Sequence, residues 1–186
     1  MKYFLYACFI ILPTIYAYSQ DTDYKWEPVE GLSLVNKGGY YGYDNGIYGG
    51  LFGYKDTNGN LVIPYKFNYA YSFKNGRALT AINSKFGFID KNGKVIIPHK
   101  YGMLREFVNG KAGANIGLTF SDAGGHQVLL TNGHWGIIDT TGKIVIPIKY
   151  DYEIIFDDNG IAKVSIKNNC GFINEKGKEI IPLKYD

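Results

Sequence analysis

Cysteine and histidine are scarce in this chain of 186 residues, and neither sign of charge is in large excess. The 20 basic residues nearly balance the 17 acidic ones, and both kinds are scattered along the chain. A nucleic-acid partner requires a clustered basic face, so we expect none. With 2 cysteines and 3 histidines there is also little material for a disulfide framework or a metal centre. Beyond residue 20 the apolar residues show no helical period, which points away from helices.

The first twenty residues differ from the rest of the chain. Lys2 precedes an apolar run over residues 3–12, and small residues follow up to Ser19. A cationic start, a short apolar stretch and a small-residue end are typical of a secretory signal peptide. The run is shorter than the roughly 20 residues of a membrane span. We predict a signal peptide over residues 1–20 and a secreted, periplasmic or cell-surface protein with no integral span in the mature chain. An uncleaved N-terminal anchor is the alternative.

Tyrosine and glycine are abundant, with 17 and 24 copies. Aromatic and β-branched residues favour strands, while glycine permits tight turns. A block that begins with an aromatic residue and glycine then recurs along the chain. Asp-x-x-Gly follows within it, and Pro-x-Lys-aromatic closes it. Its copies end on Pro64, Pro98, Pro147 and Pro182, at spacings of 34, 49 and 35 residues. Self-similarity at this period indicates a repeat architecture.

Each part of the block predicts a piece of β-structure. Asp-x-x-Gly is a hairpin turn signature, because the carboxylate bonds the turn backbone and glycine accepts a positive φ. Proline cannot donate to a sheet ladder, so we expect it to end the second strand. Between the blocks, Phe-x-Asn-Gly turns precede segments in which apolar and polar residues alternate. Ala162, Val164 and Ile166 share one side of such a segment, which predicts a strand with one buried face.

The predicted fold is all-β, with tandem antiparallel β-hairpin units in meander order over residues 21–186. Each of about four units has three strands and a short fourth, and an insertion lies at about 117–132. Residues 30–35 look like half of a unit, and so does the end of the chain. We expect a curved meander that either stays open or closes like a barrel or propeller by joining these half-units.

This pattern resembles the bacterial WG-containing β-repeat family over roughly residues 26–186. Trp135-Gly136 is the one literal Trp-Gly, and Phe52, Phe86 and Cys170 take the place of tryptophan in the other copies. The resemblance implies tandem hairpin units, often exported or surface-associated, with no common activity and no catalytic residues to carry over. The departures are the Gly/Tyr-rich stretch over residues 38–50 and the insertion.

Residues that might carry chemistry have simpler explanations. His99 occupies a variable position next to Pro98, and His126 lies in the insertion without a patterned acid or nucleophile. Asp157 belongs to a turn string that only resembles a calcium loop. The repeated lysines are expected to cover neighbouring aromatic rings with their stems. Cys170 is expected to be a buried apolar filler. We predict no catalytic residue, no metal site and no cofactor.

The Gly/Tyr-rich stretch offers aromatic side chains on a pliable backbone. Tyrosine provides contact area with a polar tip and is frequent where proteins bind partners. We predict Tyr40, Tyr41, Tyr43 and Tyr48 as ligand-binding residues, the alternative being that they fill gaps in the sheet or are partly disordered. The hypothesis is an exported, non-enzymatic module that binds a protein or a cell-surface polysaccharide. A structural envelope scaffold without a ligand, and more remotely a weak hydrolase with its site in the insertion, are the alternatives.

Overall fold

The structure, a computed structural model, describes residues 24–41, 47–122, 128–131 and 133–185. Side chains are described for these residues except 41, 47, 48, 119–122, 128–131 and 185. All regular elements in these ranges are strands, as predicted. Within the same ranges no helix is long and apolar enough to cross a membrane.

In the described part of the chain, seventeen strands form four similar antiparallel sheets and one separate hairpin. The first sheet contains β1 (Tyr24–Lys25), β2 (Leu32–Tyr41), β3 (Ile47–Asp56) and β4 (Leu61–Phe67). The second contains β5 (Tyr69–Ala70), β6 (Arg77–Ile82), β7 (Lys85–Asp90) and β8 (Val95–Tyr101). The third contains β9 (Met103–Leu104), β10 (Lys111–Ile116), β13 (His134–Asp139) and β14 (Ile144–Tyr150). The fourth contains β15 (Ile161–Ile166), β16 (Asn169–Asn174) and β17 (Glu179–Tyr185), while β11 (Thr119–Asp122) and β12 (Val128–Thr131) form the hairpin.

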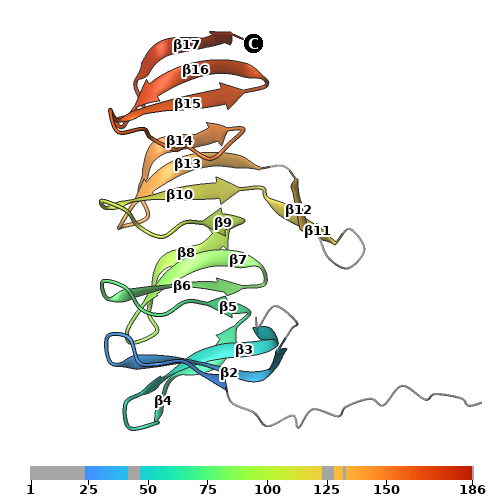
Figure 1. Cartoon of the computed structure of the whole chain (residues 1–186), viewed down its shortest axis with the longest axis vertical. Coiled ribbons are helices and arrows are strands. Elements are labelled where there is room, and N and C mark those ends of the chain that lie inside the picture. Colours follow the sequence, from blue (N-terminus) through green and yellow to red (C-terminus); the bar gives the residue numbers. More distant parts are fainter. Residues whose placement is uncertain (1–23, 42–46, 123–127, 132, 186) are drawn as a thin grey trace, which may run out of the picture.

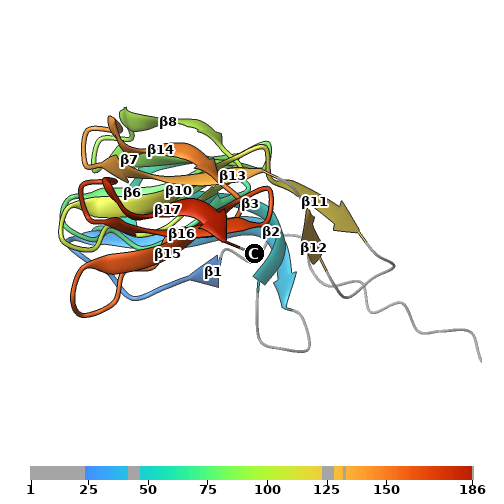
Figure 2. The same ribbon diagram turned by 90° about the horizontal axis from the view of Figure 1, so that it is seen from above.

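The four sheets stack face against face in chain order, from the first sheet at the bottom of Figure 1 to the fourth at the top. Seen from above in Figure 2, they lie over one another. Apolar residues of one sheet meet those of the next in three clusters. The anchors of these clusters are Tyr54, Phe67 and Phe73 at the first junction, Phe88, Tyr101 and Leu104 at the second, and Ile146, Tyr150 and Ile173 at the third.

The inner sheets are buried on both faces, which corrects the prediction of half-buried strands. In β6 the expected inner residues Ala78 and Thr80 are buried, and so are Leu79 and Ala81 on the opposite face. A second sheet covers that opposite face, so alternation of burial is lost. In β15 the alternation survives at Lys163, which is exposed between two buried neighbours.

An isoleucine and a glycine interlock at each junction. A Cβ added to Gly93 would lie 3.3 Å from Ile63, and Gly142 and Gly177 stand in the same relation to Ile97 and Ile146. Gly93 and Gly142 end Asp-x-x-Gly turns, Gly177 ends the equivalent Asn-x-x-Gly turn, and all three have a positive φ. The turn of one sheet therefore sits directly on the last strand of the sheet before it.

The Asp-x-x-Gly turns form as predicted. In the second sheet Asp90 Oδ1 accepts the backbone N–H groups of Asn92 and Lys94, each at 2.9 Å. Asn174 makes the equivalent pair of bonds in the fourth sheet, at 3.0 Å each. Asp157 has the same turn-forming role, because its Oδ1 accepts two backbone N–H groups of its own turn.

Proline does not end the second strand of the block, contrary to the prediction. Strands β4, β8, β14 and β17 each run through their proline, and the register with the preceding strand shifts there. These strands lie at a sheet edge, where proline is tolerated because no neighbour needs its missing N–H. The register shift is a β-bulge, and it brings the backbone next to the proline against the glycine of the aromatic-Gly pair. A Cβ on Gly87 would lie 2.5 Å from the carbonyl oxygen of Ile97, so only glycine fits.

The stack stays open, and the half-units explain why. Each sheet begins with the second half of one sequence unit and ends with the first half of the next. The segment near residue 30 therefore pairs directly with β3 in the first sheet, and β16 and β17 complete the fourth. The first and fourth sheets lie at opposite ends of the stack (Figure 1). The half-units do not pair with each other in the described structure.

Candidate binding surface

Aromatic side chains collect along the edge formed by the short first strands, which we call the first-strand edge. Tyr69, Tyr71 and Tyr152 are exposed there, and Tyr24 and Trp26 are half-buried. Tyr24 and Tyr69 occupy equivalent positions, opposite Asn36 and Ala81. In the fourth sheet a backbone bond of 2.9 Å from Asp151 to Ser165 places Tyr152 at the same point. Tyr69 and Tyr152 are 57% and 69% exposed. We call Tyr24, Trp26, Tyr69, Tyr71 and Tyr152 the aromatic column.

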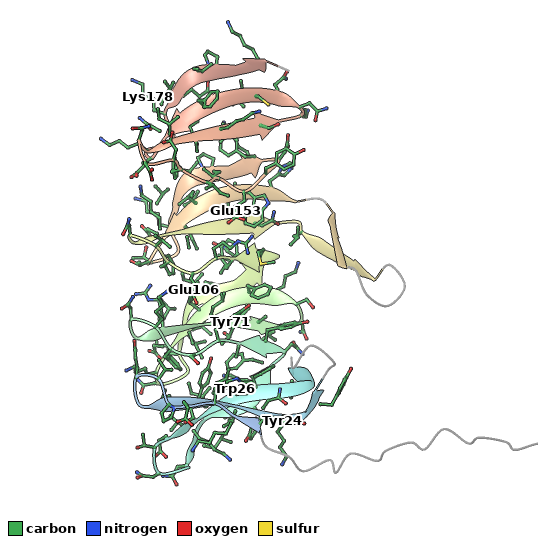
Figure 3. All side chains as sticks on the ribbon, viewed as in Figure 1. Tyr24, Trp26, Tyr71, Glu106, Glu153 and Lys178 are labelled. Atoms are coloured by element: carbon green, nitrogen blue, oxygen red, sulfur yellow. The ribbon has the colours of Figure 1, made fainter. Side chains whose placement is uncertain are left out.

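The column follows the stacking direction. Figure 3 shows Trp26, Tyr71, Glu106 and Glu153 above one another along the front of the stack, one from each sheet. Tyr71 is 52% exposed, and its carbonyl oxygen accepts a 2.7 Å bond from the hydroxyl of buried Tyr54. In the third sheet Met103 interrupts the row of rings.

The rings of the column are held by the residues beneath them. Tyr69 stacks on Phe86 with ring centroids 6.3 Å apart, and Trp26 lies 5.9 Å from Phe52. Phe86 and Phe52 belong to the recurring aromatic-Gly pairs and are buried. A fixed ring loses little conformational freedom when it binds, which favours recognition.

Charged pairs flank the rings in the upper half of the edge. Arg105 places its guanidinium 5.6 Å from the ring centre of Trp135 and forms bonds of 2.8 and 2.6 Å with Glu153 of the next sheet. The hydrogen bonds that Arg105 donates to the Glu153 carboxylate raise the pKa of Arg105. Bidentate geometry of this kind orients both side chains. The edge therefore presents rings in its lower half, and an ion pair and Tyr152 above them.

The opposite edge, formed by β4, β8, β14 and β17, has a different character. Lys66, Lys100 and Lys149 lie 5.2–5.3 Å from the ring centres of the aromatic residues that follow them. The ammonium group of each lysine therefore lies over the neighbouring ring. Lysine and proline on an edge strand discourage pairing with another chain. Protection of an open edge accounts for this surface.

Two long hairpins leave the stack on one side, visible in Figures 1 and 2 as the ends of β2–β3 and the β11–β12 hairpin. They occupy the same position in the first and third sheets. In the second and fourth sheets that position is a tight turn with positive φ, at residues 83–84 and 167–168. Sequence reasoning treated the two departures as unrelated.

Both hairpins branch from the stack through the same bend. Buried Asn36 accepts the N–H of Gly39 at 3.0 Å, and buried Asn115 accepts that of Leu118 at 3.0 Å. A glycine on the returning strand packs against each asparagine: a Cβ on Gly50 or Gly133 would lie 2.6 Å from its Oδ1. The recurrence of Asn-x-Gly before each insertion and glycine after it is the signal that was missed.

The predicted ligand-binding tyrosines lie on the first of these hairpins. Tyr40 is 57% exposed and pairs with Tyr48 across the hairpin. Tyr41 pairs with Ile47, but the side chains of Tyr41 and Tyr48 lie outside the described part. Tyr43 lies outside the described residues altogether. A binding role for these four stays a prediction, and the structure adds the aromatic column, which sequence reasoning missed.

Side chains that could take part in catalysis or metal binding are spread apart. Among the described residues no three of His, Cys, Asp and Glu gather as they would around a metal ion. His99 packs in the first junction, 6.0 Å from the ring of Phe67 and 2.8 Å from the Thr80 hydroxyl. His126 lies outside the described residues. Cys170 is half-buried instead of buried, because no described sheet follows the fourth.

Four like sheets stacked in chain order define an all-β repeat protein. The sequence profile described as "WG containing repeat" matches residues 52–86, 86–117, 135–170 and 171–186, more than half of the chain. The chain therefore belongs to the WG-containing repeat family. The first matched repeat begins at Phe52, in the third strand of the first sheet, so the family repeat is offset from the structural sheet. Comparison with curated proteins and with solved structures found no match.

Proposed function

We propose that this WG-repeat protein is an exported, non-enzymatic binding module that holds a protein or a cell-surface glycan along its first-strand edge. The observation that carries the proposal is the aromatic column. Soluble proteins rarely leave several large rings exposed in one row without a use for them. Flat rings stack on sugar faces and serve equally as anchors for protein partners.

Repetition supports an elongated partner. The aromatic column draws on three of the four sheets, and packed sheets lie about 10 Å apart. A partner that touches two or more units gains affinity through linked contacts without needing a deep pocket. The tyrosine-rich hairpin lies beside the same stack and is a second contact region in this proposal.

The family, and the spread of reactive groups among the described residues, support a non-enzymatic role. The WG family is not known as an enzyme family. Export rests on the predicted signal peptide, whose residues lie outside the described part of the chain. A tag placed after residue 186 and followed through cell fractionation tests it. Retention of the tagged protein in the cytoplasm, with residues 1–20 still attached, contradicts export.

Glycan and peptide arrays probed with the mature chain test the binding role. We compare a column variant, Tyr69→Ser with Tyr152→Ser, with a hairpin variant, Tyr40→Ala. The matched control is Val95→Ser with Ile144→Ser, which removes two apolar side chains, 47% and 49% exposed, from the opposite edge. A ligand lost in the column variant and retained in the control supports the column. A ligand retained in the column variant contradicts it, and no ligand on any array favours a scaffold.

A further inference from the structure

A cavity of about 310 Å³ opens between the second and third sheets. It lies where the Asn-Gly turns of the two sheets meet, and Asn75 and Asn109 line its mouth. Figure 3 places Glu106, another lining residue, at this junction. A space of this size is at the lower end of the range for small-molecule sites.

The inner wall of the cavity is apolar. Leu79 and Phe88 are buried beneath it, and the Phe107 ring packs at a tilt against Phe88 with ring centroids 4.9 Å apart. The exposed side of Phe107 faces the guanidinium of Arg77, whose carbon lies 5.2 Å from the ring centre. A flat apolar group therefore has rings to pack on and a cation beside it.

The charges around the cavity leave one cation over. Lys74 and Glu106 form an ion pair of 2.7 Å at the rim, so these two charges balance. Arg77 donates one bond of 3.0 Å to the carbonyl oxygen of Thr140. A guanidinium has five N–H donors. Among the described residues, the Thr140 carbonyl is the acceptor that the structure gives for the Arg77 guanidinium.

The next junction shows what Arg77 lacks. Lys111 occupies the position of Arg77 in the third sheet, and Glu175 occupies the position of Thr140 in the fourth. Lys111 bonds the carbonyl oxygen of Glu175 at 3.3 Å and its carboxylate at 2.9 Å. Arg77 has the equivalent carbonyl, but threonine supplies no carboxylate. The second junction thus holds a cation in a setting where its counterpart has a carboxylate partner.

We propose that this cavity binds a small organic carboxylate with a flat apolar body. The carboxylate takes the place that Glu175 fills at the next junction and accepts hydrogen bonds from Arg77. The apolar body packs against Phe88, Phe107 and Leu79. The site uses neither the aromatic column nor the long hairpins, so it stands independently of the proposed binding role.

The probe for the test is 3-phenylpropionate, with the neutral 3-phenylpropanamide as its matched analogue. Binding is followed by NMR titration of the full mature chain, using the backbone amide signals of Asn75, Asn109 and Thr140. A charge-assisted bond contributes enough that the amide should bind at least about tenfold more weakly than the carboxylate. Arg77→Met should weaken the carboxylate by a similar factor and leave the amide little changed. Lys111→Met, at the equivalent position one sheet on, should change neither.

A second variant separates loss of the site from loss of the fold. Thr140→Glu supplies the missing carboxylate from within, as Glu175 does. It should abolish binding of 3-phenylpropionate while the melting temperature holds or rises. The proposal is overturned if the probe produces no saturable shifts of these amides, if the amide binds as well as the carboxylate, or if Thr140→Glu leaves binding intact.

Discussion

Replacing the glycine of an aromatic-Gly pair should damage this fold far more than replacing a glycine beside it. In Trp135-Gly136 an added Cβ would lie 2.6 Å from the carbonyl oxygen of Ile146 and 2.7 Å from the Cα of Ile148. Both contacts are with backbone atoms, which cannot rotate away as a side chain can. The bulge of β14 must move, and with it the pairing of β13 and β14.

Gly113 on the adjacent strand is the matched control. It lies directly opposite Ile137, and a Cβ there would meet the flexible Arg105 side chain at 3.4 Å. Forced overpacking costs about 1–3 kcal/mol, and loss of ladder bonds adds to it, so we expect Gly136→Ala to lower the free energy of unfolding by about 3 kcal/mol. Gly113→Ala should stay within about 1 kcal/mol of the parent, because the lower entropy of the unfolded chain offsets the cost of the contact with Arg105.

Urea and thermal denaturation followed by circular dichroism measure both variants. A loss of about 3 kcal/mol corresponds to a fall in melting temperature of about 6–12 °C for a chain of this size. Equal effects from the two substitutions would refute the reasoning, because the close approach at the bulge would then not be what demands glycine.

Three further predictions test the junctions and turns. Burial, together with the charge of Lys66, lowers the pKa of His99 below its ordinary 6.5. The contribution of His99 to stability is therefore complete above pH 6.5 and is lost as the pH drops through the folded-state pKa. His99→Gln should flatten the dependence of melting temperature on pH between pH 7 and 5, and an unchanged slope contradicts this. Asp90→Asn should be nearly neutral, since Asn174 makes the same turn, whereas Asp90→Ala should cost about 1 kcal/mol in urea denaturation; equal losses would argue against the turn role. Ile97→Ala should cost about 2–5 kcal/mol and Ile181→Ala, at the same repeat position but 39% exposed, clearly less; similar losses would contradict stacking.

Local features were predictable because they depend on a few neighbouring residues. The Asp-x-x-Gly turns and the strands around them follow from side-chain bonding and from glycine's tolerance of positive φ. The lysine stems over the rings of Phe67 and Tyr101 follow from chain geometry in the same way. The meander order with a short fourth strand was also correct.

Features that depend on a second sheet were not predictable. Leu79 and Thr80 are adjacent and point to opposite faces, so their joint burial requires a sheet on each side. The position of Pro64 within β4 depends on the bulge opposite Gly53, which a single strand does not reveal. The offset between sequence repeat and sheet is likewise decided by which strands pair.

The binding role of the tyrosine-rich stretch stays a prediction. The tyrosine-rich stretch was recognised from composition alone, and Tyr40 is indeed exposed. The aromatic column was missed, because Tyr69 and Tyr152 are far apart in sequence and meet one edge only once the sheets stack. The cavity at Arg77 depends on a comparison between junctions, which needs the register of both sheets.

Nuclear Overhauser contacts between isoleucine methyl groups and glycine Hα protons test the open stack most directly. Isotope-labelled mature chain should show one such contact at each of the three junctions, linking Ile63 with Gly93, Ile97 with Gly142 and Ile146 with Gly177. Absence of these contacts, or a contact between Ile181 and Gly59 within one molecule, would contradict an open stack, the latter because it would join the first sheet to the fourth.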